Sequence, residues 1–323
     1  MRVFVAGGAG FIGSHYVRSL LKGELGVEPD AVTVFDKLTY AGNLRNLRPV
    51  KDDPRLTFHR GDICSGEDLD VVLPGHDLVI NCAAETHVDR SIVGPQEFVL
   101  TNVLGVQVLL DACLRHEIPR IVHIGTDEVY GSIEEGSWTE EDPLLPNSPY
   151  AAAKAGAELL VRAYHRTYGL NVSSTRCSNN YGPYQYPEKI IPLFVTNLLL
   201  GKKVPLYGDG LNIRDWLHVH DHCRAIQLVA TKGLPGEAYN IRGGFELTNI
   251  ELTHRILDLM GADESSIEYV EDRKGHDRRY SVDDSKLRQL GYTPTVDFQT
   301  SLSETVEWYK ENESWWRPLR GIS

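Results

Sequence analysis

The feature that most constrains the fold is a repeated alternation of short Val- and Ile-rich runs with longer helical patterns. Such alternation is typical of strands that are joined through helices and therefore pair in parallel. The candidate strands lie at residues 2–6, 31–36, 56–60, 77–83, 120–125 and 171–176. Residues 98–116 repeat apolar side chains at spacings of three and four, which predicts a helix. The chain is therefore expected to be an α/β protein with a parallel sheet.

The pattern of predicted elements changes after about residue 180, where Pro- and Gly-containing loops separate shorter elements. We therefore expect two parts within the 323 residues. Residues 1–180 form the sheet domain, and residues 181–323 form a smaller, mixed α/β lobe that binds substrate. The boundary is soft, because a chain of this kind can cross between its lobes more than once.

Charge and cysteine content exclude several classes of protein. The 45 acidic and 33 basic residues give a net charge of -12, which disfavours nonspecific binding to nucleic acid or anionic membranes. No apolar run approaches the length of a membrane-spanning helix, and the N-terminus enters a strand pattern without a signal-peptide region. We therefore expect a cytoplasmic protein. The five widely spaced cysteines lack a CxxC pair, which argues against a disulfide framework and a zinc site.

Three glycines, Gly7, Gly10 and Gly13, follow the first predicted strand and open a helix. Their G-x-x-G-x-x-G spacing lets the chain turn tightly and brings backbone N–H groups and a helix N-terminus close to a pyrophosphate. A glycine triplet alone is also compatible with an ordinary turn. Its position between a strand and a helix instead predicts a Rossmann-type doubly wound parallel sheet that binds a dinucleotide.

The end of the second predicted strand indicates which dinucleotide is bound. Asp36 can accept hydrogen bonds from both hydroxyls of an adenosine ribose and would repel a 2'-phosphate, so NAD is favoured over NADP. Lys37 argues in the opposite direction, since a basic residue can tolerate that phosphate. Asp62 and Ile63, which follow the third strand in the segment GDI, suit the adenine edge.

A second motif, SPYAAAK, begins a predicted helix. Ser148 is a natural N-cap, Pro149 suits the first helical position, and Tyr150 and Lys154 lie four residues apart on one face. An ammonium about 4 Å from a phenol, at an effective dielectric of about 20, is worth about 4 kcal/mol, or roughly three pKa units. The motif therefore predicts a phenol whose pKa approaches neutrality and which acts as a base toward a sugar hydroxyl.

Together these residues resemble the extended short-chain dehydrogenase/reductase superfamily over nearly the whole chain. Within it, several segments resemble the family of dTDP-glucose 4,6-dehydratases. They are FDKLTYAGN (35–43), AAETHVDRSI (83–92), TDEVYG (126–131), NNYGPYQYPEK (179–189), RDWL (214–217) and GHDRRY (275–280). The resemblance implies a hydro-lyase that converts dTDP-glucose to dTDP-4-keto-6-deoxyglucose with tightly bound NAD.

The same resemblance implies roles for the catalytic residues. Tyr150, supported by Lys154, takes the C4 hydroxyl proton during oxidation by NAD, and Thr126 donates a hydrogen bond to the C4 oxygen. Glu128 removes the C5 proton, Asp127 protonates the departing C6 hydroxyl, and hydride then returns to C6. A solvated pair at a strand end is the alternative interpretation of the two carboxylates.

The resemblance also implies the binding residues. The expected NAD-binding residues are Gly7, Gly10, Phe11, Ile12, Gly13, Asp36, Lys37, Leu38, Thr39, Asp62, Ile63, Ala83, Ala84, Thr86, Thr101, Tyr150, Lys154 and Asn180. The expected nucleotide-sugar residues are Thr86, Thr126, Asn179, Glu188, Lys189, Pro205, Tyr207, Arg214, Asn249, Arg273, His276 and Tyr280. Arginines suit the diphosphate because the guanidinium binds phosphate oxygens in pairs.

Three alternatives stay open at this point. His218, His220 and His222 would share one face of a strand and could hold a metal. A helix starting near Asp221 as N-cap separates them, however, and the expected chemistry needs no metal. The chain could also be an epimerase or decarboxylase acting on another nucleotide sugar. A noncatalytic NAD-binding sensor is a third possibility, although such a protein is expected to lose Tyr150 and Lys154.

The chain is expected to form a homodimer. Residues 98–116 and 150–168 resemble the helix pair that forms an intersubunit four-helix bundle across the superfamily. The apolar character of the first helix also exceeds what one face packed on a sheet requires.

Overall fold

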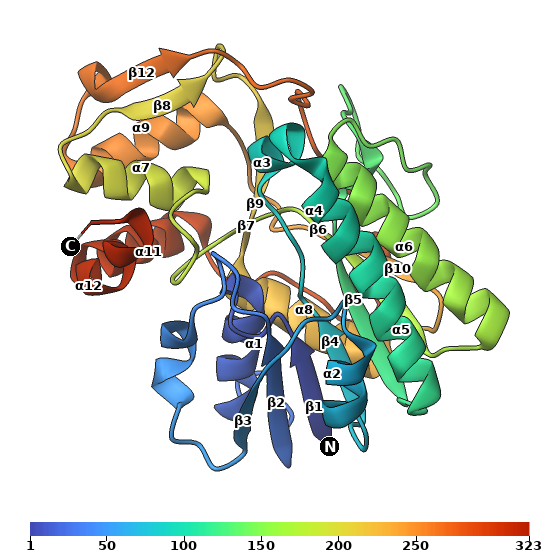
Figure 1. The fold of residues 1–323 in the computed structure, drawn as a ribbon. Helices are drawn as coiled ribbons and strands as arrows, with labels where there is room; N and C mark the ends of the chain where they lie inside the picture. The colour runs from blue at the N-terminus through green and yellow to red at the C-terminus, as the bar shows by residue number, and fades with distance from the viewer. Residues whose placement is uncertain (323) are drawn as a thin grey trace.

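The computed structural model describes residues 1–322; Ser323, the last residue of the predicted C-terminal lobe, lies outside the described residues. Its largest element is a seven-stranded sheet in the order β10-β6-β5-β4-β1-β2-β3, in which every neighbouring pair is parallel (Figure 1). The strands are β1 (Arg2–Ala6), β2 (Ala31–Asp36), β3 (Leu56–Arg60), β4 (Leu78–Asn81), β5 (Arg120–Thr126), β6 (Val172–Cys177) and β10 (Ala238–Ile241). The predicted doubly wound parallel sheet is confirmed.

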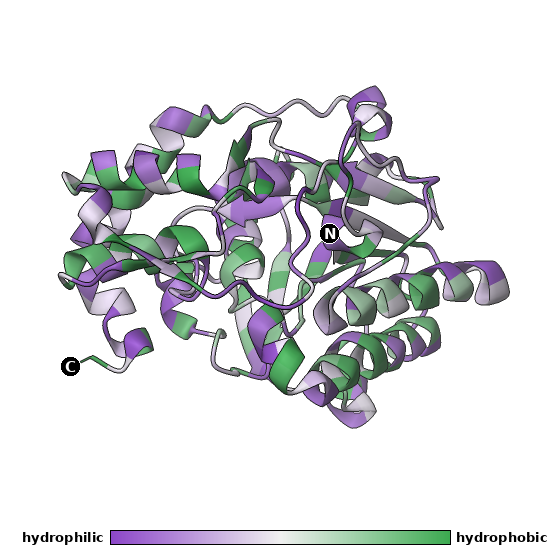
Figure 2. Cartoon of the chain, turned by 90° about the horizontal axis from the view of Figure 1, so that it is seen from above, coloured by the Kyte–Doolittle hydropathy of each residue, from purple (hydrophilic) through white to green (hydrophobic). Residues whose placement is uncertain are grey.

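Helices cover both faces of this sheet. One face packs α1 (Phe11–Leu21), α8 (Val219–Lys232) and α10 (Ser285–Gln289). The other packs α2 (Gly66–Val72), α5 (Gly105–Arg115) and α6 (Pro149–Tyr168). Hydrophobic and hydrophilic residues alternate along these helices, as expected for helices with one buried face (Figure 2). Because strand order reverses between β1 and β4, the loops after these strands diverge and leave a crevice at the carboxyl edge.

The predicted helix over residues 98–116 is present, but it contains a π-helical turn. It consists of α4 (Pro95–Val99), a wider π-helical turn (Leu100–Leu104) and α5. Asn102 in this turn accepts a hydrogen bond from Glu85 N (2.8 Å) and donates one to Glu85 O (2.9 Å), so the turn presents an amide to the loop after β4. Such π-turns are common at functional sites.

The expectation that no apolar run approaches the length of a membrane-spanning helix is wrong. The continuous helical segment Pro95–Arg115 has 21 residues and a mean hydropathy of 1.5, which by length and composition alone would suffice to cross a membrane. Its side chains Val106, Leu109 and Leu110 are buried against the sheet. The segment therefore packs on the sheet through one face, while Val99, Leu100 and Leu104 are exposed.

The rest of the chain builds a second region beside the carboxyl edge of the sheet (Figure 1). It contains a three-stranded sheet in the order β11-β9-β7 and the parallel pair β8–β12. Its strands are β7 (Asn179–Tyr181), β8 (Val204–Tyr207), β9 (Ile213–His218), β11 (Glu246–Thr248) and β12 (Ile267–Val270). Its helices are α7 (Ile190–Leu199), α9 (Asn249–Met260), α11 (Phe298–Glu311) and α12 (Glu313–Trp316), packed around a separate apolar core. Between β7 and β11 the chain returns to the large sheet as α8 and β10.

Short helical segments complete the fold. They are α3 (Val88–Val93) and 3-10 turns at Leu44–Val50, Asp127–Tyr130, Glu264–Ser266 and Pro318–Arg320. The turn at Asp127–Tyr130 matters most for function, because it directly continues β5 at the carboxyl edge.

Candidate active site

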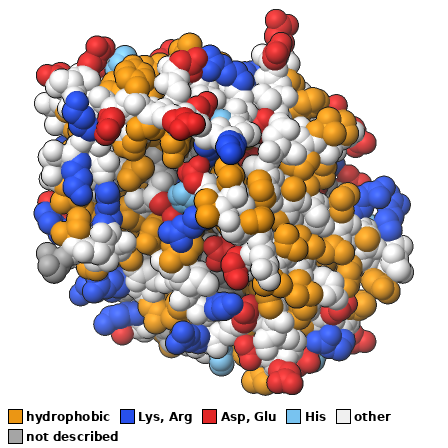
Figure 3. Space-filling model, turned by 45° about the horizontal axis from the view of Figure 1, so that its top comes forward, with side chains coloured by type: hydrophobic (Ala, Val, Ile, Leu, Met, Phe, Trp, Pro, Cys, Tyr) orange, Lys and Arg blue, Asp and Glu red, His pale blue; other side chains and the backbone are white. Residues whose placement is uncertain are grey.

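A cavity of about 590 Å³ lies where the carboxyl edge of the large sheet meets the second region. Basic, acidic and histidine side chains gather near the middle of the molecular face that carries the hollow (Figure 3). The cavity is lined from both regions, starting with Gly7 after β1 and reaching Arg273 and His276 after β12. Its position matches the crevice that the reversal of strand order creates.

Neither Gly7, in the turn after β1, nor Gly13, in the first turn of α1, could carry a side chain. Gly7 has φ +71°, and a Cβ added there would lie 2.6 Å from Ala83 N. A Cβ added at Gly13 would lie 2.3 Å from Gly7 O. Helix α1 starts at Phe11, and its N-cap Gly10 offers no side-chain hydrogen bond to the first turn. The turn is therefore a cradle that brings the first turn of α1 to the cavity, where the backbone N–H groups of Phe11, Ile12 and Gly13 suit a pyrophosphate. The N–H groups of Gly7, Ala9 and Gly10 are already hydrogen-bonded within the protein.

Asp36 is tied to this turn. Its Oδ2 accepts a hydrogen bond from Ala9 N (2.9 Å) and its Oδ1 accepts one from Leu38 N (2.8 Å). Burial raises the pKa of Asp36, and these two hydrogen bonds oppose the rise. Each oxygen retains a second lone pair for a ribose hydroxyl. Lys37 forms an ion pair with Asp62 (2.7 Å). The ammonium of Lys37, the one feature that favoured NADP, is therefore already paired with the carboxylate of Asp62.

The predicted NAD-binding residues fall into two groups. Those that line the cavity are Gly7, Gly10, Phe11, Ile12, Gly13, Ala84, Thr86, Tyr150, Lys154 and Asn180. Those outside its lining are Asp36, Lys37, Leu38, Thr39, Asp62, Ile63, Ala83 and Thr101. Most of the second group lie at the ends of β2 and β3 or directly after them, outside the cavity lining.

The two adjacent carboxylates stand in different surroundings. Asp127 is 3% exposed, and its Oδ2 has no hydrogen-bond partner within residues 1–322. Burial, followed by the neighbouring Glu128, raises the pKa of Asp127 well above its usual range. Thr126 Oγ1 accepts a hydrogen bond from Glu128 N (3.3 Å), which fixes the start of the turn. All three residues line the cavity.

Tyr150 and Lys154 line the same cavity from α6. The predicted helix start is confirmed: Ser148 Oγ accepts a hydrogen bond from Ala151 N (3.1 Å) and Pro149 follows it. Lys154 Nζ donates to Ile124 O (2.5 Å), and burial lowers the pKa of this lysine to about 8.

The expected lowering of the Tyr150 pKa is wrong for the protein alone. Burial among apolar neighbours such as Phe98, followed by the charge of Glu128, raises the pKa of the phenol well above its usual value. The ammonium of Lys154 points at a backbone carbonyl, and desolvation of the phenol outweighs its influence.

The predicted nucleotide-sugar residues also meet here. Thr86, Thr126, Asn179, Glu188, Lys189, Pro205, Tyr207, Arg214, Asn249, Arg273 and His276 all line the cavity. Tyr280 lies outside the lining. Its ring lies 4.2 Å from the Arg214 guanidinium, and its hydroxyl is 2.8 Å from Asp277 and 3.5 Å from Glu128.

A bridge joins the two regions at this cavity. Tyr40, in the loop after β2, donates a hydrogen bond to Glu188 Oε1 (2.9 Å). The Arg90 guanidinium lies 3.7 Å from the centre of the Tyr40 ring and 3.5 Å from Glu188 Oε2. His87 Nε2 is 3.7 Å from the same oxygen. Sequence reasoning missed Tyr40, His87 and Arg90 as site residues, although all three lie in segments that carried the family resemblance.

The three histidines of the metal hypothesis are separated, but by a different helix start from the one predicted. Helix α8 begins at Val219 with His218 as N-cap, so Asp221 is not the cap. Asp221 instead accepts hydrogen bonds from Thr295 N (2.8 Å) and Val296 N (2.9 Å). His222 pairs with Asn180 (2.8 Å). Within residues 1–322, no group of three or more His, Cys, Asp or Glu side chains could hold a metal ion.

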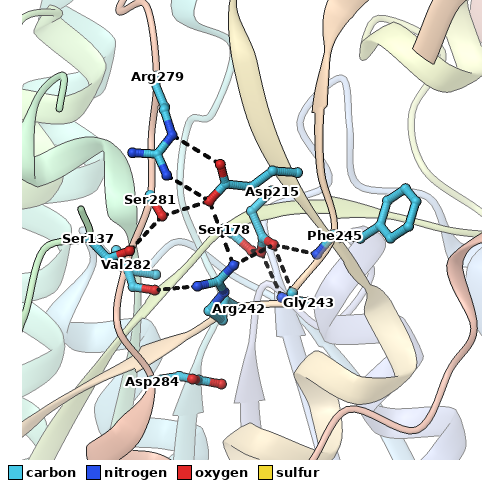
Figure 4. Close-up of polar contacts among 12 residues, drawn as sticks. Ser137, Ser178, Asp215, Arg242, Gly243, Phe245, Arg279, Ser281, Val282 and Asp284 are labelled. Carbon is cyan, nitrogen blue, oxygen red and sulfur yellow. Dashed lines mark hydrogen bonds and ion pairs between the residues drawn. The ribbon is translucent and has the colours of Figure 1, made fainter. Parts of the chain in front are cut away.

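A buried polar network supports the strand that presents Arg214. The neighbouring Asp215 is 1% exposed and turns away from the cavity lining. Its carboxylate accepts hydrogen bonds from Ser178 Oγ (2.6 Å) and from three backbone amides, those of Gly243, Gly244 and Phe245 (2.7–2.8 Å; Figure 4). Ser178 directly precedes β7, so one carboxylate joins two strands that line the site.

The glycine cradle, the tyrosine and lysine four residues apart on α6, and the cavity at the strand-order reversal define a dinucleotide-dependent enzyme of the extended short-chain dehydrogenase/reductase type. The family model described as GDP-mannose 4,6 dehydratase matches residues 4–305. A dTDP-glucose 4,6-dehydratase from an Actinoplanes species is 59% identical, over 98% of this chain and 100% of its own. One from Streptomyces niveus is 58% identical, over 99% of this chain and 96% of its own.

A solved structure with a similar fold is also a dTDP-glucose 4,6-dehydratase. The dTDP-glucose 4,6-dehydratase DesIV of Streptomyces venezuelae, crystallised with NAD bound, is 60% identical and superposes with a TM-score of 0.98. The alignment covers 99% of this chain and 100% of DesIV. The chain belongs to the nucleotide-sugar 4,6-dehydratases and, within them, to the dTDP-glucose 4,6-dehydratase family.

Proposed function

We propose that this chain dehydrates dTDP-glucose to dTDP-4-keto-6-deoxyglucose, a step of deoxysugar biosynthesis. The observation that carries the proposal is the pair Asp127 and Glu128 at the end of β5, in one cavity with Tyr150 and Lys154. An epimerase only removes and returns hydride at C4 and needs no carboxylate pair at this position. A noncatalytic sensor has no use for either the phenol or the pair. The family membership supports the same conclusion.

The cofactor is NAD. The cradle at Gly7 and Gly13 fits a pyrophosphate, and Asp36 fits an unphosphorylated ribose. When bound, NAD would supply the hydride acceptor for C4 and the hydride donor for C6, and its oxidised form carries a positive charge that favours ionisation of a phenol in the same site. Cofactor released by acid and identified by mass spectrometry should be NAD; mainly NADP would overturn this assignment.

The chain's own residues supply the proton transfers. Tyr150 takes the C4 hydroxyl proton and Thr126 hydrogen-bonds the C4 oxygen. Glu128 then removes the C5 proton, which the 4-ketone has made acidic. Asp127 protonates the C6 hydroxyl as it leaves; its raised pKa, caused mainly by burial, keeps a proton available for that step.

The second region binds the nucleotide sugar. Arg214 and Arg273 suit the diphosphate, because they bring guanidinium groups to the same cavity. Tyr207 on β8 offers an aromatic face to the base, with His276 beside it at a ring distance of 6.2 Å. Asn179 at the start of β7, and Glu188 and Lys189 in the chain that follows β7, line the cavity and suit the hexose hydroxyls. Residues 181–323 are thus mainly the nucleotide-sugar lobe, and residues 1–180 carry the cofactor and catalytic residues.

The test uses Glu128→Gln, which is nearly isosteric but cannot act as the base. This variant should still oxidise C4 on mixing with dTDP-glucose, seen as reduced-nicotinamide absorbance, but form the 6-deoxy product about a hundredfold or more slowly. In deuterated water the parent's product should carry deuterium at C5, and the variant should incorporate it far more slowly. Formation of product at the parent rate would place the base elsewhere.

The protein is also proposed to be a cytoplasmic homodimer, joined through a four-helix bundle of α4–α5 and α6 from each copy. Apolar side chains are exposed on α6 and on the helical segments beside it, at Val93, Val99, Leu100, Leu104, Leu159 and Tyr168. Figure 3 shows a broad hydrophobic area on this side of the molecule. Light scattering at micromolar concentration should give twice the 36.2 kDa chain mass, and a monomer mass would remove the proposal.

A further inference from the structure

Helix α12, near the C-terminus, is connected to the glycine turn through the side chains of Trp315 and Asn46. Trp315 Nε1 donates a hydrogen bond to Asn46 Oδ1 (2.9 Å), although the two residues are 269 positions apart. Both side chains are buried: Trp315 is 6% exposed and Asn46 is 1% exposed. The contact therefore joins the end of the chain to the 3-10 turn that follows β2.

The other end of the Asn46 amide holds the glycine turn itself. Asn46 Nδ2 donates to Ala9 O (2.9 Å), and Ala9 O also accepts from Asn43 N (3.0 Å). The Ala9 N–H donates to Asp36, so the two peptide units on either side of Ala9 are both held, one at its N–H and the other at its C=O. Ala9 lies between Gly7 and Gly10, in the middle of the proposed pyrophosphate cradle.

The orientation of the Asn46 amide follows from its partners. The indole N–H can only donate and the Ala9 carbonyl can only accept, so the oxygen must face Trp315 and the nitrogen must face the turn. Without the indole, Asn46 Oδ1 would be a buried acceptor with no partner, and the amide would lose the group that opposes its rotation. Trp315 thus helps to fix the orientation in which the Asn46 amide donates its hydrogen bond to Ala9 O.

The indole is itself held rigidly. The Trp315 ring packs on Trp308 (5.1 Å between ring centres) and on Tyr184 (5.6 Å), within the core of the second region. A second contact backs the first, because Arg45 Nη1 donates to Ser314 O (3.0 Å). The nucleotide-sugar region therefore holds the cofactor turn through fixed hydrogen bonds.

We propose that Trp315 is a positioning residue for the dinucleotide site: through Asn46 it holds the Ala9 peptide, and with it the pyrophosphate cradle, in the binding conformation. This inference rests on the proposed binding of NAD. It assigns the C-terminal segment to cofactor binding, in addition to the glycine motif and Asp36.

The test compares Trp315→Phe with Trp308→Phe in cofactor-free protein. Both changes shorten a ring in the same aromatic cluster, but only Trp315 donates to Asn46 Oδ1. Amide hydrogen exchange of residues 7–13 should be several-fold faster in Trp315→Phe and unchanged in Trp308→Phe. Calorimetric titration should show NAD binding about tenfold weaker in the first variant and within about twofold of the parent in the second.

Hydrogen exchange on adding NAD and the variant Asn46→Ala test the same connection from its two ends. Binding linkage is reciprocal, so adding NAD to the parent should slow hydrogen exchange at residues 313–316 as well as at 7–13. Asn46→Ala removes the amide without touching the aromatic cluster, so it replaces Trp315→Phe if that variant does not fold, and it should weaken NAD binding similarly. Adding Trp315→Phe to it should cause little further loss.

The outcomes separate the inference from the function on which it rests. If Trp315→Phe matches Trp308→Phe in both loop exchange and NAD affinity, Trp315 only packs the core and the inference is wrong. Protection of residues 7–13 without protection of 313–316 would also overturn it. If the parent binds no NAD, the proposed function fails, while faster exchange of residues 7–13 in Trp315→Phe alone would still establish the coupling.

Discussion

Asp127 and Asp215 are both almost fully buried, yet their surroundings are opposite. Asp127 directly follows β5, and Asp215 lies on β9. Asp215 receives four hydrogen bonds of 2.6–2.8 Å, three of them from backbone amides. Asp127 has one oxygen without a partner, and its other oxygen is 3.4 Å from Thr126 Oγ1. Asp215 therefore accepts four short hydrogen bonds, whereas Asp127 accepts only one long one among the described residues, from Thr126.

We interpret the difference as that between a structural carboxylate, Asp215, and the proposed acid, Asp127. A buried carboxylate that is ringed with donors is a fixed acceptor and can join strands. A buried carboxyl group without donors favours its protonated form, and the pKa of Asp127 is raised accordingly, mainly by desolvation. Only the second kind of group has a proton to give to a leaving hydroxyl.

The largest expected effect is that of Asp127→Asn on turnover. The amide resembles a protonated carboxyl group in shape but cannot deliver its proton, so formation of the 6-deoxy product should fall about 10²–10⁴-fold. Unfolding in urea should show stability equal to or above that of the parent. A variant that keeps parental turnover would mean that Asp127 is not the acid.

Asp215→Asn should show the reverse pattern. An amide nitrogen would face backbone N–H donors, so the free energy of unfolding should fall by about 3 kcal/mol, measured in urea. Turnover per folded molecule should stay within about tenfold of the parent, with the loss mainly in KM, because Arg214 is the neighbour displaced. Loss of all turnover in a stably folded Asp215→Asn would break the distinction between the two aspartates.

A smaller effect is expected in the pH dependence of stability. Because the folded-state pKa of Asp127 is raised above 3.8, the folded protein keeps a proton there that the unfolded chain has lost. This contribution to stability is complete below the unfolded pKa and is lost as the pH rises through the folded pKa. The stability of Asp127→Asn relative to the parent should therefore increase above about pH 4 and then level off. A difference that does not vary with pH would contradict the raised pKa.

The smallest effect is expected for Ser178→Ala. This change removes one of the four donors to Asp215 and leaves the three backbone amides in place. Stability should fall by about 1–2 kcal/mol, clearly less than in Asp215→Asn, and turnover should change little. Chemical denaturation of the two variants side by side measures the difference, and an equal loss would show that the serine carries the whole contact.

The elements that local sequence determines were predictable. The strand runs, the glycine turn, Ser148 as a helix cap and the spacing of Tyr150 and Lys154 all follow from patterns a few residues long. The structure differs where distant residues decide. The pKa of Tyr150 depends on the apolar side chains that bury it, and the π-helical turn depends on the pairing of Asn102 with Glu85. Asp221 is a good cap by residue type, but the segment Thr295–Val296 takes its carboxylate.

The bridge between Tyr40 and Glu188 has a consequence for the order in which ligands enter and leave. Tyr40 belongs to the loop beside the proposed ribose position, whereas Glu188 belongs to the proposed sugar site. One hydrogen bond therefore connects the edge of the proposed cofactor site with the edge of the proposed sugar site. We expect a dinucleotide to exchange only when this bond is open, and a nucleotide sugar to enter and leave while it stays closed. With the proposed function, such a protein would keep one cofactor through successive turnovers, and hydride taken from a sugar would return to that same sugar.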